Sequence, residues 1–372
     1  MTWPDRRLLD LFGIDVPILA APMANSAGVE LAIEVAQEGG LGALPCAVLD
    51  PAEIEAGVAA FREETNAPLN ANFFCHTPEP DDPERDCAWL AHLAPYFEAA
   101  GVAPPDLPLP AGHAPFGDAE CAAIESAKPE IVSFHFGLPA APLLSRVKDT
   151  GCKVISSATS LREARYLAEN GVDAIIAQGA EAGGHRAMFL ETDVSRQVGT
   201  FALVRSIAAN LDLPVIAAGG IADGQAIAAC FSLGAAAVQV GTAYLLTDEA
   251  WTPPLHRAAL ADPARETAMT NVLTGRPARG VVNRFMREQG PMNAAAPHFP
   301  RGRPAIAPLR AKAEAEGSSD FSPLWSGQAA TLPGAMGAGA LRGGLPTARA
   351  PSSLKDSSRL RTYTTACNRT PV

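Results

Sequence analysis

Residues 178–186 combine the side chains that proton transfer beside a flat ligand would need, namely Gln178, Gly183, Gly184 and His185. They follow the mostly apolar run 173–177, which predicts a short buried strand. The glycines predict an irregular loop, and they let a flat ligand approach the backbone closely. A histidine in such a loop can exchange a proton near neutral pH. The stretch predicts a catalytic His185, and the alternative is a solvated histidine on a flexible loop.

Two further glycine-containing dipeptides, Gly219-Gly220 and Gly241-Thr242, follow apolar runs later in the chain. Glycine amides can approach the oxygens of a phosphate closely, and the dipole of a following helix favours an anion. The Thr242 hydroxyl adds a donor. These residues predict a phosphate site, and the alternative is a pair of ordinary tight turns.

Amide side chains at two strand ends, Asn72 and Gln178, can hydrogen-bond the edge of a heteroaromatic ring, because each offers donors and an acceptor. The alternative is that they satisfy nearby backbone groups. Met23, between Pro22 and Ala24, is predicted to place backbone donors under a flat ring, with ordinary core packing as the alternative.

His135 ends another apolar run and is a second candidate for contact with a substrate. A lone histidine in that position is more often a hydrogen-bonded core residue, so it ranks below His185.

The pattern of apolar runs and helical segments explains how these residues could meet. Strands alternating with helices predict a parallel sheet, and eight of them predict a (β/α)8 barrel of the α/β class, whose site lies at the carboxyl ends of the strands. We expect the barrel to span residues 1–249, with a proline-rich insertion on its rim at about 75–117. Residues 250–330 predict a mainly helical segment beside or over the barrel mouth, and 331–372 predict a disordered tail. The eight predicted strands lie at 17–22, 41–44, 68–73, 130–136, 153–156, 174–177, 213–218 and 236–240.

Composition excludes several classes of protein. The 372 residues carry a net charge of −11, which disfavours a general nucleic-acid partner. No apolar run is long enough to predict a membrane span, and residues 1–7 lack the apolar stretch of a signal peptide. The 7 cysteines are scattered without a CxxC pair, which favours reduced thiols in the cytoplasm over a disulfide framework or a metal site.

Several common catalytic motifs are absent from the sequence. It contains no GxGxxG after its first strand, no GxxxxGK[ST] and no HExxH. Ser156-Ser157 lacks the setting of a nucleophile elbow. These absences favour a bound cofactor over hydrolysis.

At these positions the sequence resembles the nitronate monooxygenase family, formerly called 2-nitropropane dioxygenases. The resemblance spans about residues 8–328. It rests on the segments 21–24, 72–74, 133–137, 155–159, 177–186, 217–221, 238–242 and 323–328.

The resemblance implies a flavoprotein oxidoreductase that binds FMN without a covalent bond at the barrel mouth. It implies that His185 is the base, and that alkyl nitronates, and neutral nitroalkanes if accepted, react with O2 to give carbonyl compounds and nitrite. His135 is the candidate substrate residue, and no metal is expected. The residues expected to hold FMN are Pro22, Met23, Ala24, Asn72, Gln178, Gly183, Gly184, Ala218, Gly219, Gly220, Gln239, Val240, Gly241 and Thr242.

Other functions stay open at this point. An FMN-dependent reductase could use the same residues to reduce a quinone or an enoyl thioester with NAD(P)H. A flavin-free barrel could bind a phosphorylated compound as a lyase or isomerase. The sequence leaves the oligomeric state and the physiological substrate open.

Overall fold

A parallel barrel forms the larger part of the molecule. The computed structural model describes residues 3–329, so the predicted tail at 331–372 lies outside the described residues. Eight parallel strands are ordered β1-β9-β8-β6-β5-β4-β3-β2, and a bridge between Leu19 and Leu41 joins the first strand to the last. The predicted (β/α)8 barrel is confirmed, and all eight predicted strands are present. They are β1 (Ile18–Ala20), β2 (Gly42–Leu44), β3 (Leu69–Phe74), β4 (Ile131–His135), β5 (Lys153–Ala158), β6 (Ala174–Gln178), β8 (Val215–Ala218) and β9 (Ala237–Val240).

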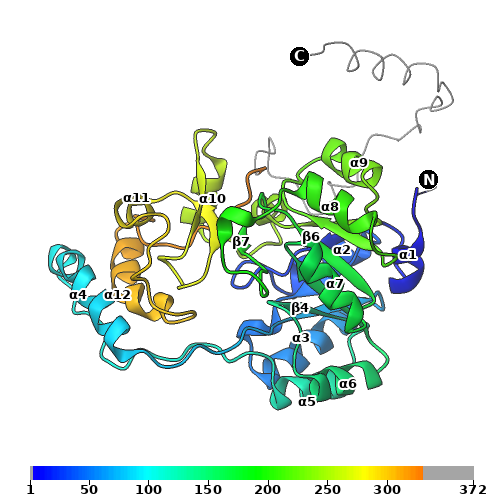
Figure 1. Ribbon diagram of the computed structural model, residues 1–372, viewed down its shortest axis with the longest axis horizontal. Coiled ribbons are helices and arrows are strands. Elements are labelled where there is room, and N and C mark those ends of the chain that lie inside the picture. Colours follow the sequence, from blue (N-terminus) through cyan, green and yellow to red (C-terminus); the bar gives the residue numbers. More distant parts are fainter. Residues whose placement is uncertain (1–2, 330–372) are drawn as a thin grey trace, which may run out of the picture.

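Helices between the strands cover the outside of the barrel (Figure 1). Local sequence fixes their starts: the N-cap Ser160 accepts a hydrogen bond from the Glu163 amide, and Asp50 forms a capping box with Glu53. The helices are α1 (Arg7–Phe12), α2 (Val29–Gln37), α3 (Pro51–Glu64), α5 (Asp118–Ala127), α6 (Ala141–Asp149), α7 (Leu161–Glu169), α8 (Thr200–Ala208) and α9 (Gly224–Ser232). Short 3-10 turns are η1 (Cys46–Val48), η2 (Val194–Arg196) and η3 (Thr242–Leu246).

Helix α1 closes the amino-terminal end of the barrel. Its side chains Leu8, Leu9 and Phe12 are buried together with strand residues such as Leu19 and Ile216. Because apolar side chains fill this end, we expect a ligand at the opposite end, where the strands finish.

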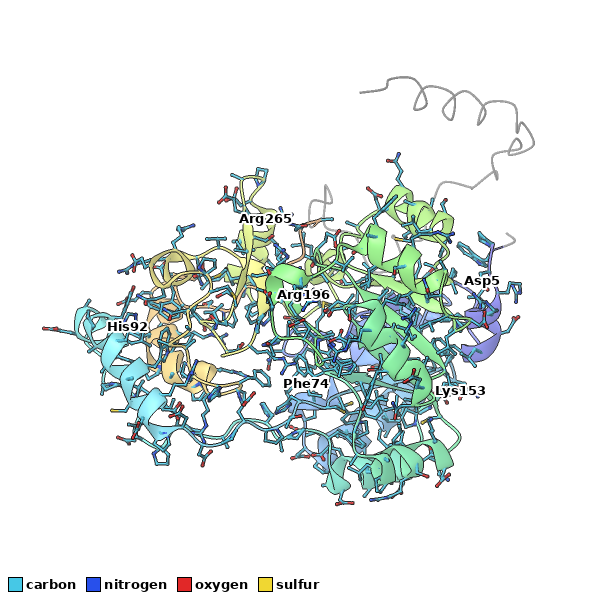
Figure 2. All side chains as sticks on the ribbon, viewed as in Figure 1. Asp5, Phe74, His92, Lys153, Arg196 and Arg265 are labelled. Carbon is cyan, nitrogen blue, oxygen red and sulfur yellow. The ribbon has the colours of Figure 1, made fainter. Side chains whose placement is uncertain are left out.

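The rim insertion and the C-terminal segment pack together into a second unit. Trp89, Leu93 and Phe97 of α4 share an apolar core with Phe285 and Phe321, which come from the end of the chain. Figure 1 shows α4 beside α12, far from the barrel helices α5 and α6 that follow it in sequence. His92 on α4 and Lys153 at the start of β5 lie at opposite sides of the molecule (Figure 2). The helices of this unit are α4 (Pro83–Ala100), α10 (Pro254–Ala261), α11 (Arg284–Gln289) and α12 (Gly302–Ala315).

The second unit also contains a small antiparallel sheet, which the sequence does not predict. Its strands are β10 (Thr267–Thr270), β11 (Ala278–Val281) and β7 (Gly184–His185), in the order β10-β11-β7. The prediction of an irregular loop at 178–186 is therefore wrong for Gly184 and His185, which pair with Arg279 and Ala278. The reason is that the partner strand lies far along the chain, where local composition carries no information about it.

No helix among residues 3–329 has the length and apolar character needed to cross a bilayer.

Candidate active site

A cavity of about 670 Å³ opens at the carboxyl ends of the barrel strands, with the second unit forming its other wall. This volume is in the range of small-molecule sites. Of the predicted site residues, Val240 alone does not line it, because its side chain lies in the core. Those lining the cavity are Pro22, Met23, Ala24, Asn72, His135, Gln178, Gly183, Gly184, His185, Ala218, Gly219, Gly220, Gln239, Gly241 and Thr242.

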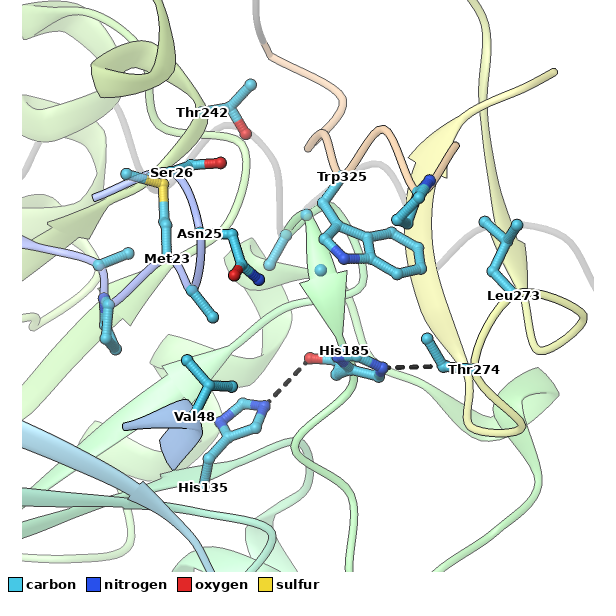
Figure 3. A pocket seen from close by; sticks show the side chains of 18 of the residues that line it. Met23, Asn25, Ser26, Val48, His135, His185, Thr242, Leu273, Thr274 and Trp325 are labelled. Carbon is cyan, nitrogen blue, oxygen red and sulfur yellow. Dashed lines mark hydrogen bonds between the residues drawn. The ribbon is translucent and has the colours of Figure 1, made fainter. Parts of the chain in front are cut away.

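His185 lies between the barrel and the second unit. Its ring centroid is 5.3 Å from those of Phe299 and Trp325, and its Nε2 is 3.0 Å from the Thr274 hydroxyl (Figure 3). Burial, and then the electrostatic effects of His135 and Arg276, lower the pKa of His185 to about 3. The imidazole is thus neutral at pH 7, with a lone pair available to accept a proton. The expectation that it titrates near neutral pH does not fit this buried setting.

His135 is hydrogen-bonded at both ring nitrogens. Its Nε2 lies 3.1 Å from the main-chain oxygen of His185, and its Nδ1 lies 3.3 Å from the Ser157 hydroxyl. A carbonyl oxygen only accepts, so Nε2 carries the proton. Burial also lowers the pKa of His135 to about 3. These contacts favour the alternative stated for His135, a satisfied histidine that supports the backbone of His185.

The amides of Gln178 and Asn72 are already engaged by the protein. Gln178 donates from Nε2 to the His185 carbonyl at 3.0 Å and accepts at Oε1 from the Ala187 amide at 2.8 Å. Asn72 donates to the Ser133 hydroxyl at 2.8 Å. Both residues line the cavity, but these contacts match the alternative in which they satisfy neighbouring groups.

Gln239 has an amide oxygen left for a ligand. It lines the cavity from β9, and its Oε1 is buried without a hydrogen-bond partner among the described residues. A buried acceptor without a partner costs free energy, so a ligand N–H donor at this position would relieve that cost.

The loops after β8 and β9 form a backbone cradle. Gly219 and Gly220 have φ values of 110° and 73°, which favour glycine. A Cβ at Gly219 would lie 2.8 Å from the Ala182 amide nitrogen, so the loop has no room for a side chain there. Within residues 3–329, the amides of Gly220 and Thr242 donate to no protein acceptor. Free amides at this place in a barrel are typical of a phosphate site.

Glu181 fixes which side of the cradle an anion could occupy. Its carboxylate accepts from the Thr200 amide at 2.8 and 3.0 Å, at the start of α8. The first turn of α8 is therefore already occupied by a negative charge, which would repel a phosphate. An anion fits instead toward Gly241 and Thr242, where η3 begins.

Several lining residues could not be identified from sequence patterns. Thr274, Phe299 and Trp325 enter the cavity from the second unit. Arg276 does not line the cavity, but its guanidinium carbon lies 4.0 Å from the centroid of the Phe136 ring, which is 6.1 Å from that of His185. Trp325 stands in one of the matching segments named above, whereas nothing in the sequence around Thr274 indicates a role.

A parallel eight-stranded barrel with a cavity at the carboxyl ends of its strands has the architecture of the (β/α)8-barrel enzymes. The family model described as nitronate monooxygenase matches residues 5–338. The chain therefore belongs to the nitronate monooxygenase family, a family of oxidoreductases.

The chain is similar to individual relatives over nearly their whole length. The chain is 41% identical over 330 residues to a nitronate monooxygenase of Paraburkholderia phytofirmans, covering 88% of this chain and 90% of the relative. It is 40% identical over 333 residues to a nitronate monooxygenase of Pseudomonas aeruginosa, covering 88% and 94%. The solved structure of a nitroalkane oxidase from Streptomyces ansochromogenes superposes with a TM-score of 0.83 at 35% identity, covering 91% of this chain and 96% of that one.

Proposed function

We propose that this protein uses non-covalently bound FMN to oxidise alkyl nitronates, and neutral nitroalkanes, with O2 to carbonyl compounds and nitrite. The observation that carries the proposal is His185, a neutral imidazole at the wall of a cavity that also holds a phosphate-type cradle. The names of the similar proteins support the same substrate class.

The residues present fit FMN. The free amides of Gly220 and Thr242 suit its phosphate, and the unpartnered Oε1 of Gln239 suits a ring N–H. At Gly184 a Cβ would meet nothing within 4 Å, so the cavity stays open beside the predicted ring site. When bound, FMN supplies the two-electron chemistry that links oxidation of the organic substrate to O2.

The chain itself would contribute proton transfer and exclusion of water. A neutral nitroalkane must lose its α-proton, and His185 is placed to accept it. A nitronate is already deprotonated and needs no such step. Phe299 and Trp325 cover the ring of His185 with apolar surface, which limits access of bulk water to the reacting carbon.

The proposal also covers the roles of the two parts of the chain and the location of the protein. Residues 1–249 are the FMN-binding unit with its rim insertion at 75–117, and 250–330 are the segment that covers the substrate. Cys46, Cys75, Cys87, Cys121, Cys152 and Cys230 are free thiols, which supports a cytoplasmic location.

The test is the visible spectrum of the purified protein, followed by anaerobic mixing with a preformed alkyl nitronate. We expect a flavin spectrum that changes on mixing and returns with oxygen, with release of nitrite. A colourless protein that binds no added FMN would contradict the cofactor. A flavin that responds to NAD(P)H but not to the nitronate would favour the reductase alternative.

A further inference from the structure

The hydroxyl of Thr274 is the hydrogen-bond partner of the His185 ring in the described part of the chain. Thr274 lies in the turn 271–277 between β10 and β11, and it is buried. Its Oγ1 is 3.0 Å from His185 Nε2, and Figure 3 shows the two side chains meeting across the cavity wall. The ring of His185 on β7 is thus held by a residue of the turn between β10 and β11.

The surroundings of Thr274 decide which atom donates. Its hydroxyl has one proton, and the Arg276 carbonyl, which can only accept, lies 3.2 Å away. The Arg276 amide points at the same oxygen from 3.4 Å. If the hydroxyl donates to the Arg276 carbonyl, its lone pairs remain for an N–H of His185. The opposite arrangement would leave that carbonyl without this donor and would put the ring proton on Nδ1.

No residue among 3–329 offers an acceptor to Nδ1 of His185, whereas Nε2 has Thr274. The backbone of His185 is also fixed, because its carbonyl accepts from both His135 and Gln178. Pairing of β7 with β11 places Ala278 opposite His185 and so holds the strand at a set distance from the turn. The ring therefore has one anchored nitrogen and one without a protein partner.

We propose that Thr274 is a positioning residue that holds His185 as the Nε2–H tautomer and leaves Nδ1 as the atom that accepts the substrate proton. The assignment of Nδ1 as the proton acceptor rests on the proposed function. In the step itself the α C–H bond of a nitroalkane breaks, an N–H bond forms at Nδ1, and the electron pair of the C–H bond passes to the nitro group to give the nitronate. The Nε2–H bond to Thr274 then has a charged donor, and such bonds are stronger than neutral ones.

The first measurement is the tautomer in the resting protein. In protein labelled with ¹⁵N-histidine, with the His185→Asn variant used for assignment, the two ring nitrogens of a neutral imidazole differ in shift and in coupling to the ring carbon-bound protons. We expect His185 to carry its proton on Nε2. A proton on Nδ1 in the wild-type protein overturns the proposal, whatever the enzyme then does with any substrate.

The second measurement uses Thr274→Val, which removes the hydroxyl at nearly constant volume, and Thr274→Ser, which keeps it. Thr270→Val is the matched control: it makes the same change on the same hairpin, at a buried threonine whose Oγ1 contacts the Val272 amide. We expect Thr274→Val to slow turnover of a neutral nitroalkane by about 10- to 100-fold, the range for loss of a hydrogen bond to a charged group. Turnover of the preformed nitronate should change little, and Thr274→Ser should recover most of the loss.

Equal losses on both substrates, or a Thr274→Ser variant as slow as Thr274→Val, would overturn the positioning role. If the valine variant fails to fold, the wild-type tautomer and the serine variant still decide. If the wild-type protein oxidises no nitronate while His185 shows the Nε2–H tautomer, the proposed function fails. The inference that Thr274 holds His185 as the Nε2–H tautomer then still stands.

Discussion

The Nε2 of His135 donates a hydrogen bond to the main-chain oxygen of His185 at 3.1 Å. The two cavity histidines are therefore connected through the backbone and not from ring to ring. Because Nδ1 of His135 faces the Ser157 hydroxyl, this ring has no nitrogen left over for a substrate. His135 therefore fixes the backbone of β7, whereas the Nδ1 of His185 has no protein partner among the described residues and can accept a proton.

His185→Asn should slow turnover of a neutral nitroalkane far more than turnover of a nitronate. We expect turnover of a neutral nitroalkane to fall by about 10²–10⁴-fold, the usual contribution of a positioned base. Turnover of the preformed nitronate should fall much less, and the FMN content should be nearly unchanged because the cradle lies at β8 and β9. Steady-state kinetics on both substrates, with the flavin-to-protein ratio, checks this. Equal losses on the two substrates would mean that His185 orients the substrate and does not act as the base.

Gly220→Asp should expel FMN. The residue has a φ of 73° and lies 3.3 Å, measured from a Cβ built on it, from Glu181, so a side chain is strained there and a carboxylate adds negative charge beside the proposed phosphate site. Absorbance of the purified variant gives the flavin-to-protein ratio. Gly101→Asp is the control, since Gly101 has a similar φ of 64° at the end of α4 and no atom within 4 Å of a Cβ. Stoichiometric FMN in the Gly220 variant would refute the cradle.

His76 should make the fold sensitive to acid. Burial, and then the charge of Arg276, lowers the pKa of His76 from 6.5 to about 4. Below pH 6.5 the unfolded chain binds a proton at this residue, whereas the folded protein does so only below about pH 4. The stability that depends on His76 is therefore lost as pH falls through this window, by about 1.4 kcal/mol per pH unit.

His76→Leu removes this titration while keeping the position apolar. The free energy of unfolding in urea, measured from pH 6.5 to pH 4.5 for both proteins, should fall less steeply in the variant by about 1.4 kcal/mol per pH unit. Parallel curves for the two proteins would show that His76 is not the group responsible.

Arg301 should be needed to hold the rim insertion in place. Its guanidinium donates to Asp86 of α4 at 2.7 Å, and the two side chains are 10% and 2% exposed. Arg301→Met leaves Asp86 buried without its partner, which costs about 3–5 kcal/mol, and adding Asp86→Leu should recover much of that loss. Arg284→Met, which breaks an exposed pair with Glu288, should cost about 1 kcal/mol or less. Urea unfolding of the four proteins checks the ranking, and equal costs for the two arginines would contradict it.

The barrel could be predicted because its elements are specified locally. Each strand is a short apolar run, and residues such as Ser160 and Asp50 mark where a helix begins. The carboxyl ends of these strands meet by geometry alone, which is why nearly all predicted site residues line one cavity.

The second unit and the details of the site could not be predicted, because both depend on contacts between distant parts of the chain. Strand β7 exists only because β11 supplies its partner. Which amide is free also depends on such contacts: Gln178 and Asn72 have found protein partners, and Gln239 has not. The residue type and its position after a strand look the same in the sequence whether or not the folded protein supplies a partner for the amide.

The core of the second unit has a consequence for the order of events during synthesis. Trp89, Leu93 and Phe97 leave the ribosome early, but their partners Phe285 and Phe321 are made about 190 residues or more later. For most of translation the apolar face of α4 has nothing to cover it, and an exposed face of this kind is prone to aggregate or to bind a chaperone. The turn that carries Thr274 arrives equally late. Until residues 267–281 have been made, β7 lacks its partner strand β11 and the His185 ring lacks the Thr274 hydroxyl.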